Sequence, residues 1–309
     1  MPRVSVVIPA HNAASFLPET LASVSAQTFG DWEIVVVDDG SRDATWSILE
    51  SAGPRVRALR NQTALGPAAA RNVALAQAHG ELVAFLDADD LLLPSYLERQ
   101  IARLDEAVAQ GRRVGLVACD ALLLDDGRYA DYTYLDMTPD RHLPITLDRV
   151  LRRNPIFISA LVPRAVGQQV GWFDEALFGT EDFGLWLKIL ERGYEAIGNP
   201  EPLAVYRRST GTVSTDIARQ GANNRRAYEL ALARGALTSR QRRIATRAIR
   251  YNRAMEAVAE LRFGRRSPRS VLKLVARIPL LLHVAATNPR WWRQWVTVLR
   301  TGRSTVIGR

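Results

Sequence analysis

Three carboxylates directly follow a short apolar run in the first third of the chain. Residues 82–86 are all apolar, and Asp87, Asp89 and Asp90 come next. A run of this kind is typical of a β-strand that is buried on both faces. Asp87 and Asp89 are two residues apart, so in an extended chain they point the same way and can share one hard cation. Crowded acids repel one another, so without a cation at least one of their pKa values should rise. Taken alone, the pattern is also typical of a strand end followed by an acidic turn.

The surrounding sequence predicts the elements that would hold these acids. Apolar β-rich runs alternate with segments of helical spacing. Strands are predicted at residues 4–8, 32–37, 56–59 and 82–86, and helices at 13–27, 43–51, 66–78 and 94–110. This repetition favours an α/β fold with a mostly parallel sheet and helices on both faces. In such sheets a ligand binds outside the carboxyl ends of the strands. Polar pairs lie at these ends, at His11-Asn12, Asp38-Asp39 and Asp87-Asp89.

The pattern is more mixed beyond residue 110. We expect a strand at 114–118, an irregular loop or hairpin over 120–145, a helix at 147–153, a strand at 156–162, a turn at 171–175, a helix from Glu181, and short extended segments at 195–197 and 203–207. Arg-rich helical segments follow at 223–234, 239–263, 267–287 and 290–299. The change in character predicts two domains, residues 1–217 and 218–309.

Composition narrows the class of protein. With 309 residues and 47% hydrophobic content, the chain can bury a substantial core. Its single cysteine, Cys119, excludes an intrachain disulfide framework. The start of the chain is not typical of a signal peptide, and no apolar run is long enough for a membrane-spanning helix.

The charge is divided unequally along the chain. Residues 219–309 contain 21 Lys and Arg against 3 Asp and Glu, a net charge of +18. The other residues contain 20 Lys and Arg against 29 Asp and Glu, a net charge of −9. The two parts together give the overall net charge of +9. The two parts are therefore expected to face different partners.

Five segments in order resemble one enzyme family. They are Val-Val-Ile-Pro-Ala-His-Asn (6–12), Val-Val-Val-Asp-Asp-Gly-Ser-Arg-Asp (35–43), Gly-Pro-Ala-Ala-Ala-Arg-Asn (66–72), Phe-Leu-Asp-Ala-Asp-Asp (85–90) and Glu-Asp-Phe-Gly-Leu-Trp-Leu (181–187). Over about residues 3–210 the chain resembles the family 2 glycosyltransferases, which are inverting enzymes of the GT-A fold. The C-terminal ninety or so residues lie outside the resemblance.

The resemblance implies roles for particular residues. Asp182 would be the catalytic base, and Asp89 would bind a divalent metal, Mn²⁺ or Mg²⁺. Donor-binding positions would be Pro9, Ala10, His11, Asp39, Arg71 and Asp87. Glu181 and Trp186 would lie on the acceptor side. Arg71 would lie near the diphosphate or brace the acids. Some of these residues have plainer alternatives: Glu181 and Asp182 as charges at a helix start, His11 as a turn residue, Arg71 as a helix-surface salt bridge, and Trp186 as core.

The implied reaction moves a sugar from a nucleoside-diphosphate sugar, by default a UDP-sugar, to a hydroxyl of a glycan or lipid-linked acceptor. A base on the face opposite the leaving group takes the acceptor proton, and the helix start should favour the ionised form of Asp182. One position departs from the family. Where many relatives have a histidine that helps to bind the metal, this chain has Arg208 and Ser209. The third protein ligand is therefore left open.

The basic tail suggests where the enzyme works. Trp291, Trp292 and Trp295 lie among arginines, a combination typical of segments at a membrane surface. We expect a cytoplasmic protein that binds an anionic membrane surface peripherally on the inner face of the cell membrane. A helical cap or oligomer interface and nucleic-acid binding are the alternatives for the tail. A nucleotidyltransferase on a similar sheet would need a Lys- and Gly-rich loop that residues 10–15 lack. The sugar, the acceptor and the oligomeric state stay open.

Overall fold

The computed structural model describes residues 1–138, 140–208 and 217–263. The chain divides into two compact units, Met1–Ser209 and Thr210–Arg309, and each is described by itself. A domain boundary near residue 217 stays a prediction. No described helix has the length and apolar character needed to cross a lipid bilayer.

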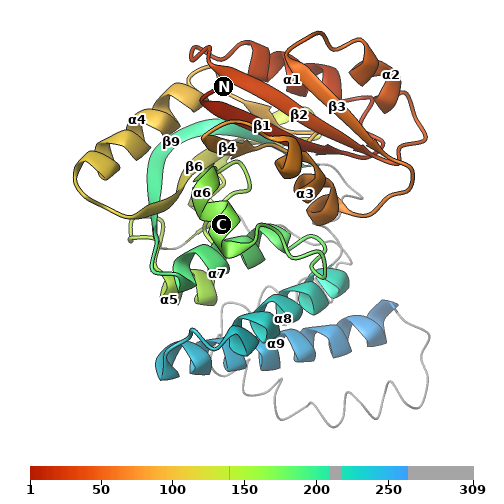
Figure 1. Cartoon of the computed structure of the whole chain (residues 1–309). Helices are drawn as coiled ribbons and strands as arrows, with labels where there is room; N and C mark the ends of the chain where they lie inside the picture. Colours follow the sequence, from red (N-terminus) through yellow and green to blue (C-terminus); the bar gives the residue numbers. More distant parts are fainter. Residues whose placement is uncertain (139, 209–216, 264–309) are drawn as a thin grey trace. The chain divides into compact units, whose positions relative to one another are not determined.

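The described part of the N-terminal unit contains a nine-stranded sheet (Figure 1). The strands are β1 (Val4–Ala10), β2 (Trp32–Asp39), β3 (Val56–Asn61), β4 (Leu82–Phe85), β5 (Leu91–Leu92), β6 (Val114–Asp125), β7 (Arg128–Thr133), β8 (Leu161–Pro163) and β9 (Glu195–Arg208). Their order is β3-β2-β1-β4-β8-β6-β9-β5, and β7 pairs with β6. The first four strands in this order are parallel, β8 is antiparallel to both of its neighbours, and β9 is parallel to β6.

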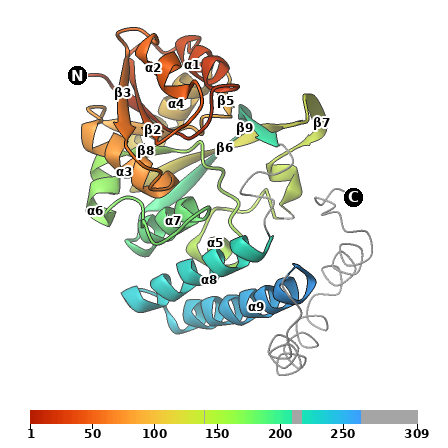
Figure 2. The same ribbon diagram turned by 90° about the vertical axis from the view of Figure 1, so that its right-hand side faces the viewer.

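Helices cover both faces of this sheet. They are α1 (Leu17–Ser25), α2 (Thr45–Glu50), α3 (Pro67–Gln77), α4 (Tyr96–Ala109), α5 (Leu147–Arg152), α6 (Arg164–Val170) and α7 (Glu181–Glu191), with a short 3₁₀ turn at Leu135–Met137. Figures 1 and 2 place α1, α2 and α4 on one face and α3, α6 and α7 on the other. The predicted α/β fold, a mostly parallel sheet flanked by helices, is therefore confirmed.

The central strands explain why this arrangement is stable. Val35, Val36 and Val37 of β2 have no exposed surface, although neighbouring side chains on a strand point to opposite faces. A strand that is apolar on both faces needs helices on both sides. Gly66, at a φ of 97°, and Pro67 at the first turn begin α3 directly beside the ends of these strands.

Two predictions for residues 110–210 need correction, and one helix was not predicted. The apolar run at 156–162 is not one strand. Its residues are buried, but only 161–163 pair with neighbours, because apolar sequence reports burial and not strand pairing. The segments 195–197 and 203–207 belong to one strand, β9, whose register against β6 shifts along its length. The helix α6 was not predicted, although Gly171 in the left-handed conformation ends it.

The described part of the C-terminal unit is a pair of helices, α8 (Ile217–Arg234) and α9 (Ser239–Phe263), which lie side by side in Figures 1 and 2. The predicted bounds of α9 are confirmed, whereas α8 begins six residues before the predicted 223. Ion pairs join the two helices, from Arg225 to Glu256 at 2.7 Å and from Arg253 to Glu229 at 3.3 Å. The predicted helices at 267–287 and 290–299 lie outside the described residues.

Candidate active site

The acidic turn lies directly after β4, at the carboxyl end of the parallel strands. One carboxylate oxygen from each of Asp87, Asp89 and Asp90 lies within 4.8 Å of the others. The hydroxyl of Thr20, on α1, lies 2.9 Å from the carbonyl oxygens of Ala88 and Asp90 and so ties the turn to the first helix. The sheet thus brings the three acids together, as their spacing suggested.

The negative charge of these three acids is only partly compensated by cations and hydrogen-bond donors among the described residues. Burial and the neighbouring Asp87 raise the pKa of Asp89 to about 6. Burial and Asp89 raise the pKa of Asp90 well above its usual range. Asp90 Oδ1 accepts a hydrogen bond from the Arg207 amide at 2.9 Å, but Oδ2 is buried and has no hydrogen-bond partner within the described part of the chain. The expected rise in pKa is confirmed. Crowded hard oxygen donors of this kind fit a divalent cation.

Arg71 links the acidic turn to the start of α7. Its guanidinium forms an ion pair with Asp87 and another with Glu181 Oε1 at 2.6 Å, and its side chain is only 3% exposed. Burial lowers the pKa of this guanidinium, but Asp87 and Glu181 outweigh that effect and raise it. Arg71 therefore braces both acids, one of the two roles that the resemblance implied, and its burial does not fit a helix-surface salt bridge. A direct contact between Arg71 and a diphosphate stays a prediction.

Asp182 follows Glu181 in the first turn of α7 and is half-buried. Burial, followed by the charge of Glu181, raises the pKa of Asp182 to about 7. The hydrogen bond from the Phe183 amide at the helix start lowers the pKa of Asp182, in the expected direction, but burial and the neighbouring acids outweigh it and the net shift is upward. Glu181 itself is 5% exposed and paired with Arg71, so it is a buried partner of that guanidinium and is not open to an acceptor.

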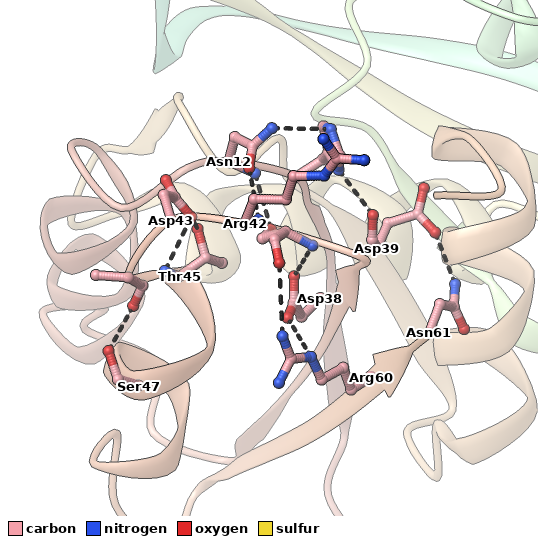
Figure 3. A network of polar contacts seen from close by, with 12 residues as sticks. Asn12, Asp38, Asp39, Arg42, Asp43, Thr45, Ser47, Arg60 and Asn61 are labelled. Atoms are coloured by element: carbon pink, nitrogen blue, oxygen red, sulfur yellow. Dashed lines mark hydrogen bonds and ion pairs between the residues drawn. The ribbon is translucent and has the colours of Figure 1, made fainter. Parts of the chain in front are cut away.

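The donor-side residues form a network at the ends of β1 and β2, shown in part in Figure 3. Asp39 is buried, and its carboxylate accepts hydrogen bonds from Asn61 Nδ2 at 2.8 Å and from the amides of Leu65 and Gly66 at 2.9 and 2.8 Å. Asp39 thus holds the loop that leads into α3. A contact between Asp39 and a nucleobase stays a prediction.

His11 lies exposed at the mouth of this network. Its Nδ1 is 2.7 Å from the carbonyl oxygen of Asp39, and its Nε2 is 3.0 Å from Asn12 Nδ2. A carbonyl oxygen only accepts and an amide nitrogen only donates, so these two contacts select the neutral ring with its proton on Nδ1. His11 is therefore a turn residue in this structure. The two hydrogen bonds fix the orientation of its ring before any ligand binds.

The remaining predicted residues lie deeper. Pro9 is half-buried and Ala10 is 1% exposed, both within β1 beside the end of β2. Trp186 has no exposed surface, and its ring lies 6.3 Å from that of Phe85 in the core. The core alternative for Trp186 matches this burial.

Sequence reasoning missed the part that Arg207 plays. Its amide binds Asp90, its guanidinium lies 3.2 Å from the carbonyl oxygen of Asp89, and it forms an ion pair with Glu19. The neighbouring Arg208 pairs instead with Asp125, in the β6–β7 hairpin. Ser209 lies outside the described residues. Only the pairing of β9 with β5 and β6 brings Arg207 to the acidic turn, so no local signal indicates it.

Three aromatic side chains gather near Asp182. The rings of Tyr134 and Tyr206 lie 5.3 and 5.2 Å from the ring of Phe157. Burial and then the charge of Asp182 raise the pKa of Tyr134, so this member of the cluster lies within electrostatic range of the acid. Tyr134 belongs to the segment 120–145 that was predicted as a loop or hairpin, and no local signal links it to Phe157 and Tyr206.

Comparison with known proteins identifies the family. The family model described as glycosyl transferase family 2 matches residues 5–121. TuaG of Bacillus subtilis, named for a glycosyltransferase step in teichuronic acid biosynthesis, is 32% identical over 219 residues, 70% of this chain and 82% of TuaG. This chain belongs to glycosyltransferase family 2.

Other similar proteins agree with this assignment. WfgD of Escherichia coli, a UDP-Glc:alpha-D-GlcNAc-diphosphoundecaprenol beta-1,3-glucosyltransferase, is 41% identical over 102 residues, 33% of this chain and 40% of WfgD. Among solved structures, S. aureus TarS in complex with UDP-GlcNAc has a TM-score of 0.64 at 20% identity, over 89% of this chain and 79% of TarS 1–349. The mannosyltransferase PcManGT of Pyrobaculum calidifontis, in complex with GDP-Man and Mn²⁺, has a TM-score of 0.62 at 25% identity, over 96% of this chain and 83% of PcManGT. The chain is thus a glycosyltransferase with the GT-A fold.

Proposed function

We propose that this glycosyltransferase moves a sugar, with inversion, from a nucleoside-diphosphate sugar to a hydroxyl of a glycan or lipid-linked acceptor. The observation that carries the proposal is the linked set of acids, in which Arg71 joins the turn after β4 to the start of α7. The acidic turn after β4 suits a charged donor. The start of α7 presents Asp182, a carboxylate with a pKa near neutrality.

The donor would bind along the ends of β1, β2 and β4. Pro9, Ala10, His11 and Asp39 would line the nucleoside, and Asp87 would contact the ribose or the sugar. A UDP-sugar is the default donor, supported by the UDP-GlcNAc bound to TarS, although PcManGT binds GDP-Man. The network that fixes His11 and Asp39 offers a preformed surface for the nucleoside (Figure 3).

A divalent cation, Mn²⁺ or Mg²⁺, would be held by Asp89, with Asp87 and Asp90 in support. When bound, such a cation neutralises the charge of a diphosphate leaving group. The protein contributes the oxygen donors and holds their turn through Thr20 and Arg207. Arg71 keeps Asp87 in place and, if it also reaches the diphosphate, would add a cationic contact.

Asp182 would be the base. A carboxylate with a pKa of about 7 is partly ionised at neutral pH and basic enough to take the proton of an attacking hydroxyl. Arg71, through Glu181, fixes the first turn of α7 and so positions Asp182. Tyr134 and Tyr206, which are half-buried and pack against the buried Phe157, would offer ring faces to the acceptor sugar, which makes them a better acceptor wall than the buried Trp186.

We place the enzyme at an anionic membrane surface on the cytoplasmic side. The support is the net charge of +18 over residues 219–309 and the diphosphoundecaprenol-linked acceptor named for WfgD. An acceptor on a lipid carrier would be met at that surface.

The test of the proposed function is substitution of the metal position. Asp89→Ala removes one oxygen donor from the acidic turn, so Mn²⁺-dependent protection by UDP in a thermal-melting assay should be lost while the melting of the free protein is retained. Asp131→Ala, which changes an exposed acid on β7, is the control and should keep the protection. Unchanged UDP and Mn²⁺ protection in Asp89→Ala would rule out its metal role.

A further inference from the structure

One face of α9 is an exposed row of arginines. The residues that line a single hollow on this helix are Ser239, Arg242, Arg243, Thr246, Arg247 and Arg250. All four arginines are exposed. Residues 239–255 contain no Asp or Glu, so the helix itself supplies no acid to this face.

The row differs from the other arginines of the same unit in its partners. Arg225 pairs with Glu229 and Glu256, and Arg253 pairs with Glu229. The three acids between residues 217 and 263 are Glu229, Glu256 and Glu260, far fewer than the arginines. Within the described residues, Arg242, Arg243, Arg247 and Arg250 have no ion pair.

Helix geometry places three of these arginines, Arg243, Arg247 and Arg250, opposite the buried side of α9, whereas Arg242 lies at the edge of that side, seven residues before the buried Ile249. Ala245, Ile249 and Asn252 are buried, and each lies two residues after Arg243, Arg247 and Arg250 in turn. Two residues correspond to a rotation of about 200° around a helix, so the two rows lie on opposite faces. The row from Ser239 to Arg250 is about 16 Å long at the rise of an α-helix.

We propose that this face of α9 binds the phosphate groups of an anionic lipid surface. Arginine guanidinium groups bind phosphate through several donors, and the hydroxyls of Ser239 and Thr246 lie in the same hollow to donate as well. A row of cations along one exposed helix face suits an anionic surface. The inference rests on the proposed membrane location and assigns it to described residues, independently of residues 264–309.

A substitution in the full-length chain tests this assignment. The triple variant Arg243→Gln, Arg247→Gln, Arg250→Gln removes three charges from the row without shortening the chain. Its partitioning onto vesicles of 30 mol% phosphatidylglycerol in phosphatidylcholine should fall on the order of 100-fold, since each arginine near an anionic surface contributes about fivefold. The wild type should bind vesicles of pure phosphatidylcholine weakly, and 10 mM inorganic phosphate should not displace it from the anionic ones.

The control removes the same charge from elsewhere. Arg57→Gln, Arg128→Gln, Arg192→Gln changes three exposed arginines of the N-terminal unit and should alter vesicle binding less than threefold. Both variants should keep the melting shift with UDP and Mn²⁺, which separates this inference from the donor site.

Three results would overturn the inference. Equal anionic-vesicle binding by the α9 variant and the wild type would overturn it and leave the membrane location standing. Absence of wild-type binding would overturn both. Tighter wild-type binding to a 20-base-pair DNA duplex than to the vesicles, lost in the α9 variant, would assign the row to nucleic acid instead.

Discussion

At the scale of single residues, the site depends on acids whose charges are balanced unequally. Asp87 and Glu181 have a shared cation in Arg71, whereas Asp89, Asp90 and Asp182 have raised pKa values because burial and like charges oppose their ionisation. Such shifts cluster at functional sites, where an acid is needed for binding a cation or for moving a proton.

Asp182→Asn should leave donor binding intact and lower turnover by about 10²–10⁴-fold, because it removes the proton acceptor at nearly constant volume. Only the ionised base is active, so wild-type activity should rise with pH and be half-maximal at or below about 7, since a bound cation favours ionisation. Steady-state rates between pH 5.5 and 8.5 measure this. A flat wild-type profile, or a product that retains the donor's anomeric configuration, would exclude this role for Asp182.

Arg71→Met should destabilise the fold by about 3–5 kcal/mol, because it leaves Asp87 and the buried Glu181 without their cation. Urea unfolding followed by circular dichroism measures the change. Arg99→Met breaks an exposed pair with Glu201 and should cost less than about 1 kcal/mol. Equal losses for the two variants would mean that Arg71 is no more than a surface partner.

At the scale of elements, the loops that follow the strands position the site residues, and specific hydrogen bonds hold two of these loops in place. Asp39 at the end of β2 holds the loop before α3, and Thr20 of α1 holds the turn after β4. The sheet supplies the positions, and these ties supply the orientation.

Gly40→Ala should weaken UDP binding at least tenfold. Gly40 has a φ of 68°, and an added Cβ would lie 2.6 Å from the backbone nitrogen of Ala64, in the loop that Asp39 holds. Gly53→Ala is the matched control, with a φ of 85° and nothing within 4 Å of its added Cβ. It should cost about 1–2 kcal/mol of stability and leave UDP binding unchanged. Calorimetric titration with UDP and Mn²⁺ compares the affinities of the two variants. Equal affinities would show that the loop held by Asp39 can shift to accommodate the added Cβ of Gly40→Ala.

At the scale of the whole molecule, acidic and basic charge are segregated along the chain. The segregation places negative charge with the GT-A fold and positive charge with the helical region, as expected of parts that meet different partners. The N-terminal compact unit has its own sheet and buried core.

Residues 1–217, produced alone, should therefore bind UDP and Mn²⁺ with an affinity within threefold of that of the full chain, while losing attachment to anionic vesicles. Calorimetry and vesicle sedimentation measure the two properties. An aggregated fragment, or one that does not bind UDP, would mean that the C-terminal helices complete the donor domain.

The sequence by itself determined the order of elements and the class of chemistry. Apolar runs and polar strand ends are local, and Asp87, Asp89 and Asp90 are adjacent in the chain, so their convergence followed from spacing. Spacing also accounts for the repulsion that adds to burial in raising the pKa of Asp89. The family was recognised from five short segments of sequence, without knowledge of how they lie relative to one another in space.

Tertiary structure alone decided which groups compensate which. Arg71 and Glu181 are 110 positions apart, and Arg207 and Asp90 are 117 apart, so only the paired strands and packed helices bring them together. Burial also outweighed the helix-start effect expected for Asp182 and raised its pKa, because desolvation depends on what packs around a helix start and not on the helix itself. Trp186 lies in the core for the same reason. Helical spacing predicts which face of a helix is apolar, but not which elements pack against that face.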